Sequence, residues 1–207
     1  MKRTLALSLA LIICAAVSAA TAPAVPPKLV VLDVELTGDL GGAEFTAEHQ
    51  ARLNLASAKL RESLARTGLY QLVDRASAQS DIDELKSRYL YLHDCNGCDL
   101  DLGRKLGADQ ILVAWVNRVS GLILSLTYEI HDVATGQIIA RKSFDFRGDN
   151  DTSWTRAIDY MVRDLVESAS TRGSNAGVFD ASSAVGSAVG QPESRQHSFI
   201  LRLRSRV

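Results

Sequence analysis

The chain has 207 residues, of which 46% are hydrophobic and 23% are charged, and its formal net charge is −1. Acidic residues slightly outnumber basic ones, 24 against 23. No basic cluster stands out in the patterned part of the chain, which argues against a nucleic-acid partner.

The N-terminus has the pattern of a secretory signal peptide. Lys2 and Arg3 precede an apolar run of residues 5–17, and small residues follow. This pattern predicts a signal peptide at residues 1–20. No later run is long and apolar enough for a membrane span, so we expect a soluble, periplasmic protein after signal removal.

Composition divides the rest of the chain into three parts. A Pro-rich spacer at residues 21–28 leads into residues 29–167, where apolar residues recur regularly. The segment 168–207 is rich in Ser, Ala and Gly until a basic, partly alternating end, residues 199–207. Because it offers little apolar surface to offset the entropy of ordering, we predict a flexible tail from residue 168 with a frayed end.

Apolar periodicity predicts one domain in the order β-α-β-α-α-β-β-β-α. The expected elements are a strand at 29–36, a helix at 45–67, a strand at 70–75, helices at 78–91 and 99–106, strands at 109–119, 122–131 and 137–146, and a final helix after residue 151. The strand at 109–119 is apolar on both alternating sets, which indicates cover on both faces. The sequence therefore predicts an α/β (α+β) fold with a mixed sheet backed by helices.

Two cysteines remain after signal removal, within the stretch "LHDCNGCDLDLG". The third, Cys14, lies inside the signal's apolar run behind Ile13, where lipidation would require a small residue, so we do not expect a lipoprotein. In an exported chain an even, closely spaced pair favours a disulfide between Cys95 and Cys98. Asn96 is followed by glycine, a good tight-turn pair that would let the two sulfurs meet.

Two other interpretations of this motif remain open. His93, Cys95 and Cys98 could contribute three metal ligands, although zinc sites usually draw a second ligand pair from elsewhere. A redox dithiol is the other alternative. The helix that follows would stabilise a thiolate, but Asp94, Asp99 and other nearby aspartates oppose it.

Two groups of polar residues are candidates for a partner surface. Thr127, Glu129 and Arg141 lie on the polar side of the hairpin strands, if helices leave that face uncovered. The stretch "RGDNDTSWTR" supplies Arg147 and Arg156. Its aspartates are typical of a helix cap, with Trp154 in the core, and we prefer this interpretation to a binding patch.

Two motifs carry a resemblance to known periplasmic domains. Residues 102–140 contain Leu106-Gly-Ala-Asp109 and His131-Asp-Val-Ala-Thr-Gly136. This pattern resembles the helix–strand–hairpin core of TolB amino-terminal and CsgG-like domains. The C-x-x-C before the "GAD" helix and the "RG..D.SW.R" segment resemble more closely an uncharacterised family of exported proteobacterial proteins of unknown function. Relatives of the fold dock onto proteins or assemble, and an association of the family with quinoprotein dehydrogenase systems is a further implication of the resemblance.

No motif of a known catalytic site is present. The chain lacks a P-loop, a dinucleotide-binding G-x-G-x-x-G, a G-x-S-x-G elbow and an H-E-x-x-H helix. We therefore expect no cofactor and no enzymatic activity. The preferred hypothesis is a binding or assembly accessory with a periplasmic protein partner; the alternative is a redox or metal-handling accessory that uses Cys95 and Cys98.

Overall fold

The computed structural model describes residues 25–182, with side chains described as far as residue 171. It confirms the predicted α/β class, with one mixed sheet backed by helices. The signal peptide at 1–20 and residues 183–207 lie outside the described part. The elements are β1 (Lys28–Val31), β2 (Glu35–Gly38), η1 (Ala43–Phe45), α1 (Thr46–Thr67), β3 (Gln71–Leu72), η2 (Ala76–Ala78), α2 (Gln79–Arg88), η3 (Leu92–Asp94), α3 (Cys98–Lys105), β4 (Gln110–Arg118), β5 (Ile123–Asp132), β6 (Ile138–Arg147) and α4 (Asp151–Ser182).

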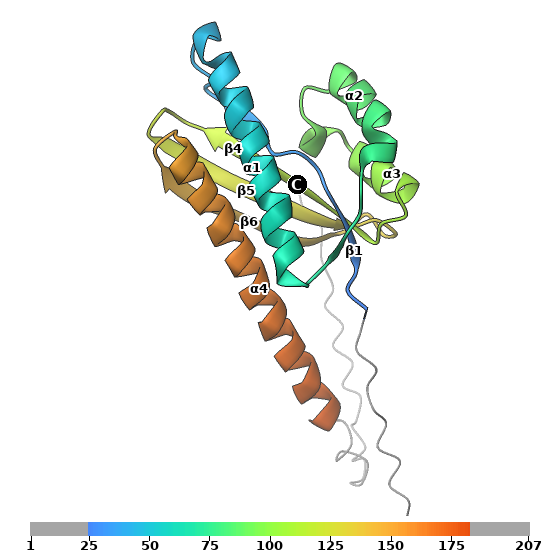
Figure 1. Ribbon diagram of the computed structural model, residues 1–207. Coiled ribbons are helices and arrows are strands. Elements are labelled where there is room, and N and C mark those ends of the chain that lie inside the picture. The colour runs from blue at the N-terminus through green and yellow to red at the C-terminus, as the bar shows by residue number, and fades with distance from the viewer. Residues whose placement is uncertain (1–24, 183–207) are drawn as a thin grey trace, which may run out of the picture.

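The strands form a sheet in the order β3-β1-β4-β5-β6, and β2 also pairs with β4. Strands β1, β2 and β3 run parallel to their partners, while the hairpin strands β5 and β6 pair antiparallel. Helices α1 and α4 lie along one face of the sheet, and α2 and α3 lie on the other (Figure 1). This two-sided cover explains why β4 is apolar on both alternating sets, as the sequence predicted.

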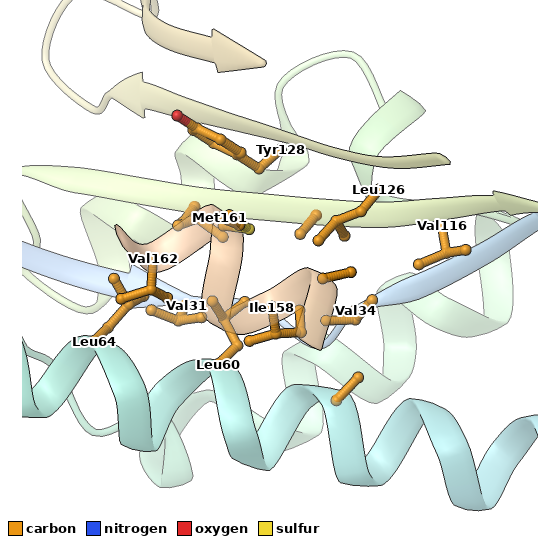
Figure 2. Close-up of a cluster of buried hydrophobic side chains, with 14 of the residues drawn as sticks. Val31, Val34, Leu60, Leu64, Val116, Leu126, Tyr128, Ile158, Met161 and Val162 are labelled. Carbon is orange, nitrogen blue, oxygen red and sulfur yellow. The ribbon is translucent and has the colours of Figure 1, made fainter. Parts of the chain in front are cut away.

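The larger core fills the space between the sheet and the pair α1 and α4. Leu60 and Leu64 of α1 meet Ile158 and Met161 of α4 beneath Leu126 of β5 (Figure 2). A smaller core on the opposite face lies under α2 and α3. The apolar stripe of α4 is buried in the larger core, and its residues are Trp154, Ile158, Met161 and Leu165.

A bulge interrupts the strand that the sequence predicted at 29–36. Val31 and Glu35 pair with Leu112 and Trp115 of β4. The segment between Val31 and Glu35 contains one residue more than the segment of β4 between these two partners. The extra residue leaves the ladder, and the N–H of Val34 donates to the Ser57 hydroxyl of α1 at 2.9 Å instead. A continuous apolar run could not reveal this break, because a bulge depends on the partner strand.

The bulge directs Asp33 into a cluster of three cations. Its carboxylate accepts hydrogen bonds from Arg61 of α1 at 3.0 Å, from Arg75 at 2.5 Å and from Lys86 of α2 at 3.0 Å. Burial alone would raise the pKa of the Asp33 carboxyl, but the hydrogen bonds from Arg75 and Lys86 outweigh it and hold the pKa well below its usual range. One side chain thus joins helices from both layers.

Replacing Asp33 with asparagine is expected to lower the free energy of unfolding by about 2 kcal/mol at pH 7, because charged hydrogen bonds are lost. A carboxyl whose pKa is lower in the folded state stabilises the fold above its unfolded pKa of about 4. The difference between the two proteins should therefore shrink as the pH falls below about 4. Urea unfolding from pH 3 to 7 measures this, and the exposed Asp83→Asn is the control; a pH-independent difference would contradict the account.

Helix α4 extends further than the sequence predicted. It continues to Ser182, whereas a flexible tail was expected from residue 168. The segment 168–182 is poor in apolar residues, but a helix that is already formed lengthens by one hydrogen bond per residue fixed. The C-terminal part of α4 consequently projects beyond the sheet (Figure 1).

Candidate functional site

The two cysteines lie in a buried turn in front of α3. Cys95 and Cys98 form a disulfide, with their Cα atoms 5.7 Å apart. Asn96 and Gly97 between them both have positive φ, at 54° and 105°, which is the tight turn that the pair Asn-Gly favours. Both cysteines are buried among apolar side chains of the smaller core, and Cys98 also lines an open pocket between α2 and α3.

His93 is engaged elsewhere. Both the Leu92 and His93 backbone N–H groups donate to the Glu35 carboxylate of β2, at 2.6 and 3.1 Å. The His93 ring also contacts Glu35 and stacks on Trp115, with centroids 4.2 Å apart and planes inclined by 9°. Within residues 25–182, no three His, Cys, Asp or Glu side chains are arranged to hold a metal ion. Glu35 of β2 and Trp115 of β4 therefore anchor this loop to the sheet through Leu92 and His93.

Replacing Cys95 and Cys98 together with serine is expected to lower the free energy of unfolding by about 2 kcal/mol, the loss estimated for opening so short a loop. Fold and partner binding should persist, because the Glu35 contacts remain. Urea unfolding followed by circular dichroism measures the loss. A variant that retains full stability but loses binding would instead favour a chemical role for the sulfurs.

The polar face of the hairpin, which the sequence suggested as a partner surface if no helix covers it, is buried at Thr127 and Glu129. Thr127 and Glu129 are both buried, with 9% and 7% of their surface exposed. Helix α3 covers this end of the sheet, and its Asp99 contacts the His131 Nδ1 at 2.6 Å, while the His131 Nε2 lies 2.8 Å from Glu129. Of the three predicted surface residues only Arg141 is exposed, and it pairs with Glu129 at 3.0 Å. This face therefore does not form the expected surface.

The stretch at 147–156 caps α4 through one residue and secures it through another. The Asn150 side chain accepts the Ser153 N–H at 3.0 Å, so the cap interpretation is confirmed for Asn150. Asp149 instead turns inward, where Arg52 of α1 and Arg118 of β4 each donate to it at 2.7 Å. Trp154, in the core as predicted, donates from Nε1 to the same carboxylate at 3.0 Å.

The electrostatics of this cluster follow from its burial. Burial alone would raise the pKa of the Asp149 carboxyl, but the Arg118 hydrogen bond and the charge of Arg52 outweigh it and hold the pKa below its usual range. Arg52 is only 4% exposed and stacks over Trp154 at 5.9 Å. Sequence reasoning missed Arg52 and Arg118 because each looks like an ordinary exposed cation on its own element. The cluster joins α1, β4 and α4, so its role is structural.

An open groove lies between β6 and the first half of α4. Its volume is about 430 Å³, and it is lined by Phe144, Asp145, Phe146, Arg147, Ser153, Arg156, Ala157 and Tyr160. Phe144 packs edge-on against Tyr160, with centroids 5.0 Å apart. The two predicted arginines, Arg147 and Arg156, thus line the same groove as these aromatic residues. Sequence reasoning missed Phe144, Phe146 and Tyr160, because a strand and a helix that face each other only in the fold supply them.

The groove is also lined by arginines that form no ion pair within residues 25–171. Within residues 25–171, every lysine and arginine has an ion pair with a carboxylate except Lys28, Arg147, Arg156 and Arg163. Arg147 and Arg156 line the groove, and Arg163 lies over the Tyr160 ring at 5.1 Å. Elsewhere in residues 25–171, every lysine and arginine except Lys28 is neutralised by a partner within the chain. A local excess of arginine beside accessible aromatic rings is typical of a binding surface.

Among residues 25–182, no helix combines the length and the apolar character that crossing a membrane requires.

Comparisons with known proteins identify a family and several similar structures. The DUF3280 family, described as "Protein of unknown function (DUF2380)", matches residues 27–166. The C-terminal domain of LpoB from Escherichia coli is 20% identical over 57% of this chain and 81% of that one, with a TM-score of 0.41. Lipoprotein GNA1162 from Neisseria meningitidis is 15% identical over 72% and 99%, with a TM-score of 0.39. TolB from Acinetobacter baumannii is 12% identical over 69% and 29%, with a TM-score of 0.38. A comparison with curated protein sequences found no match.

Proposed function

The chain belongs to the DUF3280 family, and we propose that it is an exported, non-enzymatic accessory protein that binds another protein of the periplasm. The observation that carries this proposal is the groove between β6 and α4. It combines the exposed Tyr160 and the half-buried Phe144 and Phe146 with arginines that have no carboxylate partner within residues 25–171. Such arginines leave charge for a partner to neutralise.

Two features support export. The first 20 residues have the charged and apolar pattern of a signal peptide. The buried disulfide between Cys95 and Cys98 belongs to an oxidising compartment, because disulfides are rare in the cytosol. Both features fit a protein that folds after translocation.

The redox or metal-handling alternative has less support from the geometry. Both cysteines are buried, and His93 is bound to Glu35 and stacked on Trp115. Thiol titration and metal analysis of protein purified from the periplasm test this alternative directly. An exchanging dithiol or a bound metal would favour it over docking, as would a dependence of a quinoprotein dehydrogenase on the two cysteines.

Site-specific photocrosslinking in cells tests the docking proposal. A photoreactive phenylalanine derivative replaces Tyr160, which lines the groove and is 48% exposed; the control replaces Tyr89, which is 41% exposed at the end of α2. We expect one discrete adduct with another envelope protein at Tyr160 only. That adduct should disappear when Arg147→Glu and Arg156→Glu are added. Equal adducts at both positions, or none at Tyr160, would contradict the proposal.

A further inference from the structure

Strand β6 forms an open edge of the sheet. The strand order ends at β6, whose ten residues pair with β5 on one side only within the described part of the chain. The opposite edge is β3, which has two residues. A long unpaired edge presents a row of backbone N–H and C=O groups that another strand can use. Figure 1 shows this edge beside the first half of α4.

The hydrogen-bond alternation identifies which groups are open. The Gly148 N–H donates to the Leu122 carbonyl at 3.0 Å, so Gly148 and Leu122 form a hydrogen-bonded pair. The neighbouring pair, Arg147 and Ile123, is then a non-hydrogen-bonded pair. In an antiparallel pair, bonded and non-bonded residues alternate, so the backbone groups of Ser143, Asp145 and Arg147 point to the open edge. A strand added here would lie at the mouth of the groove, next to Phe144 and Phe146.

The charge of this region selects among strands that could be added. Arg147 and Arg156 line the groove, Arg163 stands beside it, and Asp145 is the one acidic side chain in its lining. Arginine binds carboxylates with paired, charge-assisted hydrogen bonds, which gives geometry as well as attraction. A basic strand would be repelled. The chain's own basic end, residues 199–207, is therefore a poor occupant on charge.

We infer that the groove binds an extended, acidic segment of the partner protein, which pairs with β6 as an additional strand. Its apolar side chains contact Phe144 and Tyr160, and its carboxylates meet Arg147 and Arg156. Recognition by strand addition takes affinity from backbone hydrogen bonds and specificity from pockets for alternate side chains. This inference rests on the proposed function and adds the chemistry and conformation of the bound segment.

Two matched peptides test the charge preference with the full mature chain. One has the sequence of residues 199–207, Phe-Ile-Leu-Arg-Leu-Arg-Ser-Arg-Val. The other is the same peptide with Arg202→Glu, Arg204→Glu and Arg206→Glu, so apolar content and alternation are unchanged. We expect the acidic peptide to bind at least about tenfold more tightly by fluorescence anisotropy, because its carboxylates meet the arginines of the groove where the basic peptide is repelled.

Backbone methylation tests strand pairing separately. Two versions of the acidic peptide carry N-methyl groups at either the even or the odd positions. Because only alternate residues of an added strand direct their N–H groups to β6, one version should lose about tenfold or more in affinity and the other should retain most of it. Docking through side chains alone predicts equal losses and would overturn the inference.

The remaining outcomes also decide the inference. Tighter binding of the basic peptide would identify the chain's own end as the occupant, and a dimer dissociated by the acidic peptide would identify a second copy; either overturns it. Failure of both peptides to bind overturns it as well, while the crosslink at Tyr160 still decides the proposed function. A preference for the acidic peptide together with unequal methylation effects is the supporting result.

Discussion

Replacing Asp149 with alanine is expected to lower the free energy of unfolding by about 3–5 kcal/mol, the range for removing one partner of a buried ion pair. The substitution leaves Arg52 and Arg118 without their common carboxylate, and it leaves the Trp154 Nε1 without an acceptor. Since a domain of this size is stable by only about 5–15 kcal/mol, we expect a marginally folded protein. Urea unfolding followed by circular dichroism measures the loss.

Asp151 provides the matched control for this substitution. It also contacts Arg52, at 3.2 Å, but its side chain is 68% exposed. Asp151→Ala should therefore cost only about 0.5–1 kcal/mol, as exposed ion pairs do. Equal losses for the two substitutions would show that burial does not decide the contribution of this cluster. A loss below about 1 kcal/mol for Asp149→Ala would contradict its structural role.

Exchanging the charge of the groove is expected to reverse its peptide preference. With Arg147→Glu and Arg156→Glu, attraction to the acidic peptide becomes repulsion. The affinity ratio of acidic to basic peptide should fall by about 100-fold, because an approximately tenfold preference for the acidic peptide becomes a similar preference for the basic one. Anisotropy at low and high salt measures the ratio, and both preferences should weaken at high salt because exposed charges are screened.

The matched control places the same exchange elsewhere on the surface. Arg66→Glu and Arg104→Glu alter two exposed arginines whose partners are neighbours on their own helices. This variant should bind both peptides as the unchanged protein does. The groove variant should unfold at a similar urea concentration, since neither of its arginines has an ion pair within residues 25–171. A stable groove variant with the original preference would contradict the assignment of charge recognition to these arginines.

Local sequence patterns were sufficient to predict much of the fold. The helical period located α1, and Gly68, with φ of 68°, ends it where predicted. The two-sided apolar run identified β4 as the covered strand. The strands predicted at 122–131 and 137–146 bracket the β5–β6 connection, where the Thr135 and Gly136 N–H groups donate to Asp132. These features depend on residues a few positions apart, so the sequence contains their causes.

The missed features depend on residues that are distant in the chain. Arg52 and Asp149 are 97 positions apart, and Arg118 and Asp149 are 31 apart, so no local pattern connects them. The groove was found in part: Arg147 and Arg156 belong to one motif, but their aromatic neighbours come from β6 and from a later turn of α4. The burial of Thr127 and Glu129 depends on where α3 lies across the sheet, which alternation along one strand cannot indicate.

The length of α4 carries its C-terminal end far from the groove. From Arg156 at the groove to Ser182 the helix rises about 40 Å, at about 1.5 Å per residue. A partner bound at the groove would therefore have to extend about this far along the helix to contact its C-terminal end.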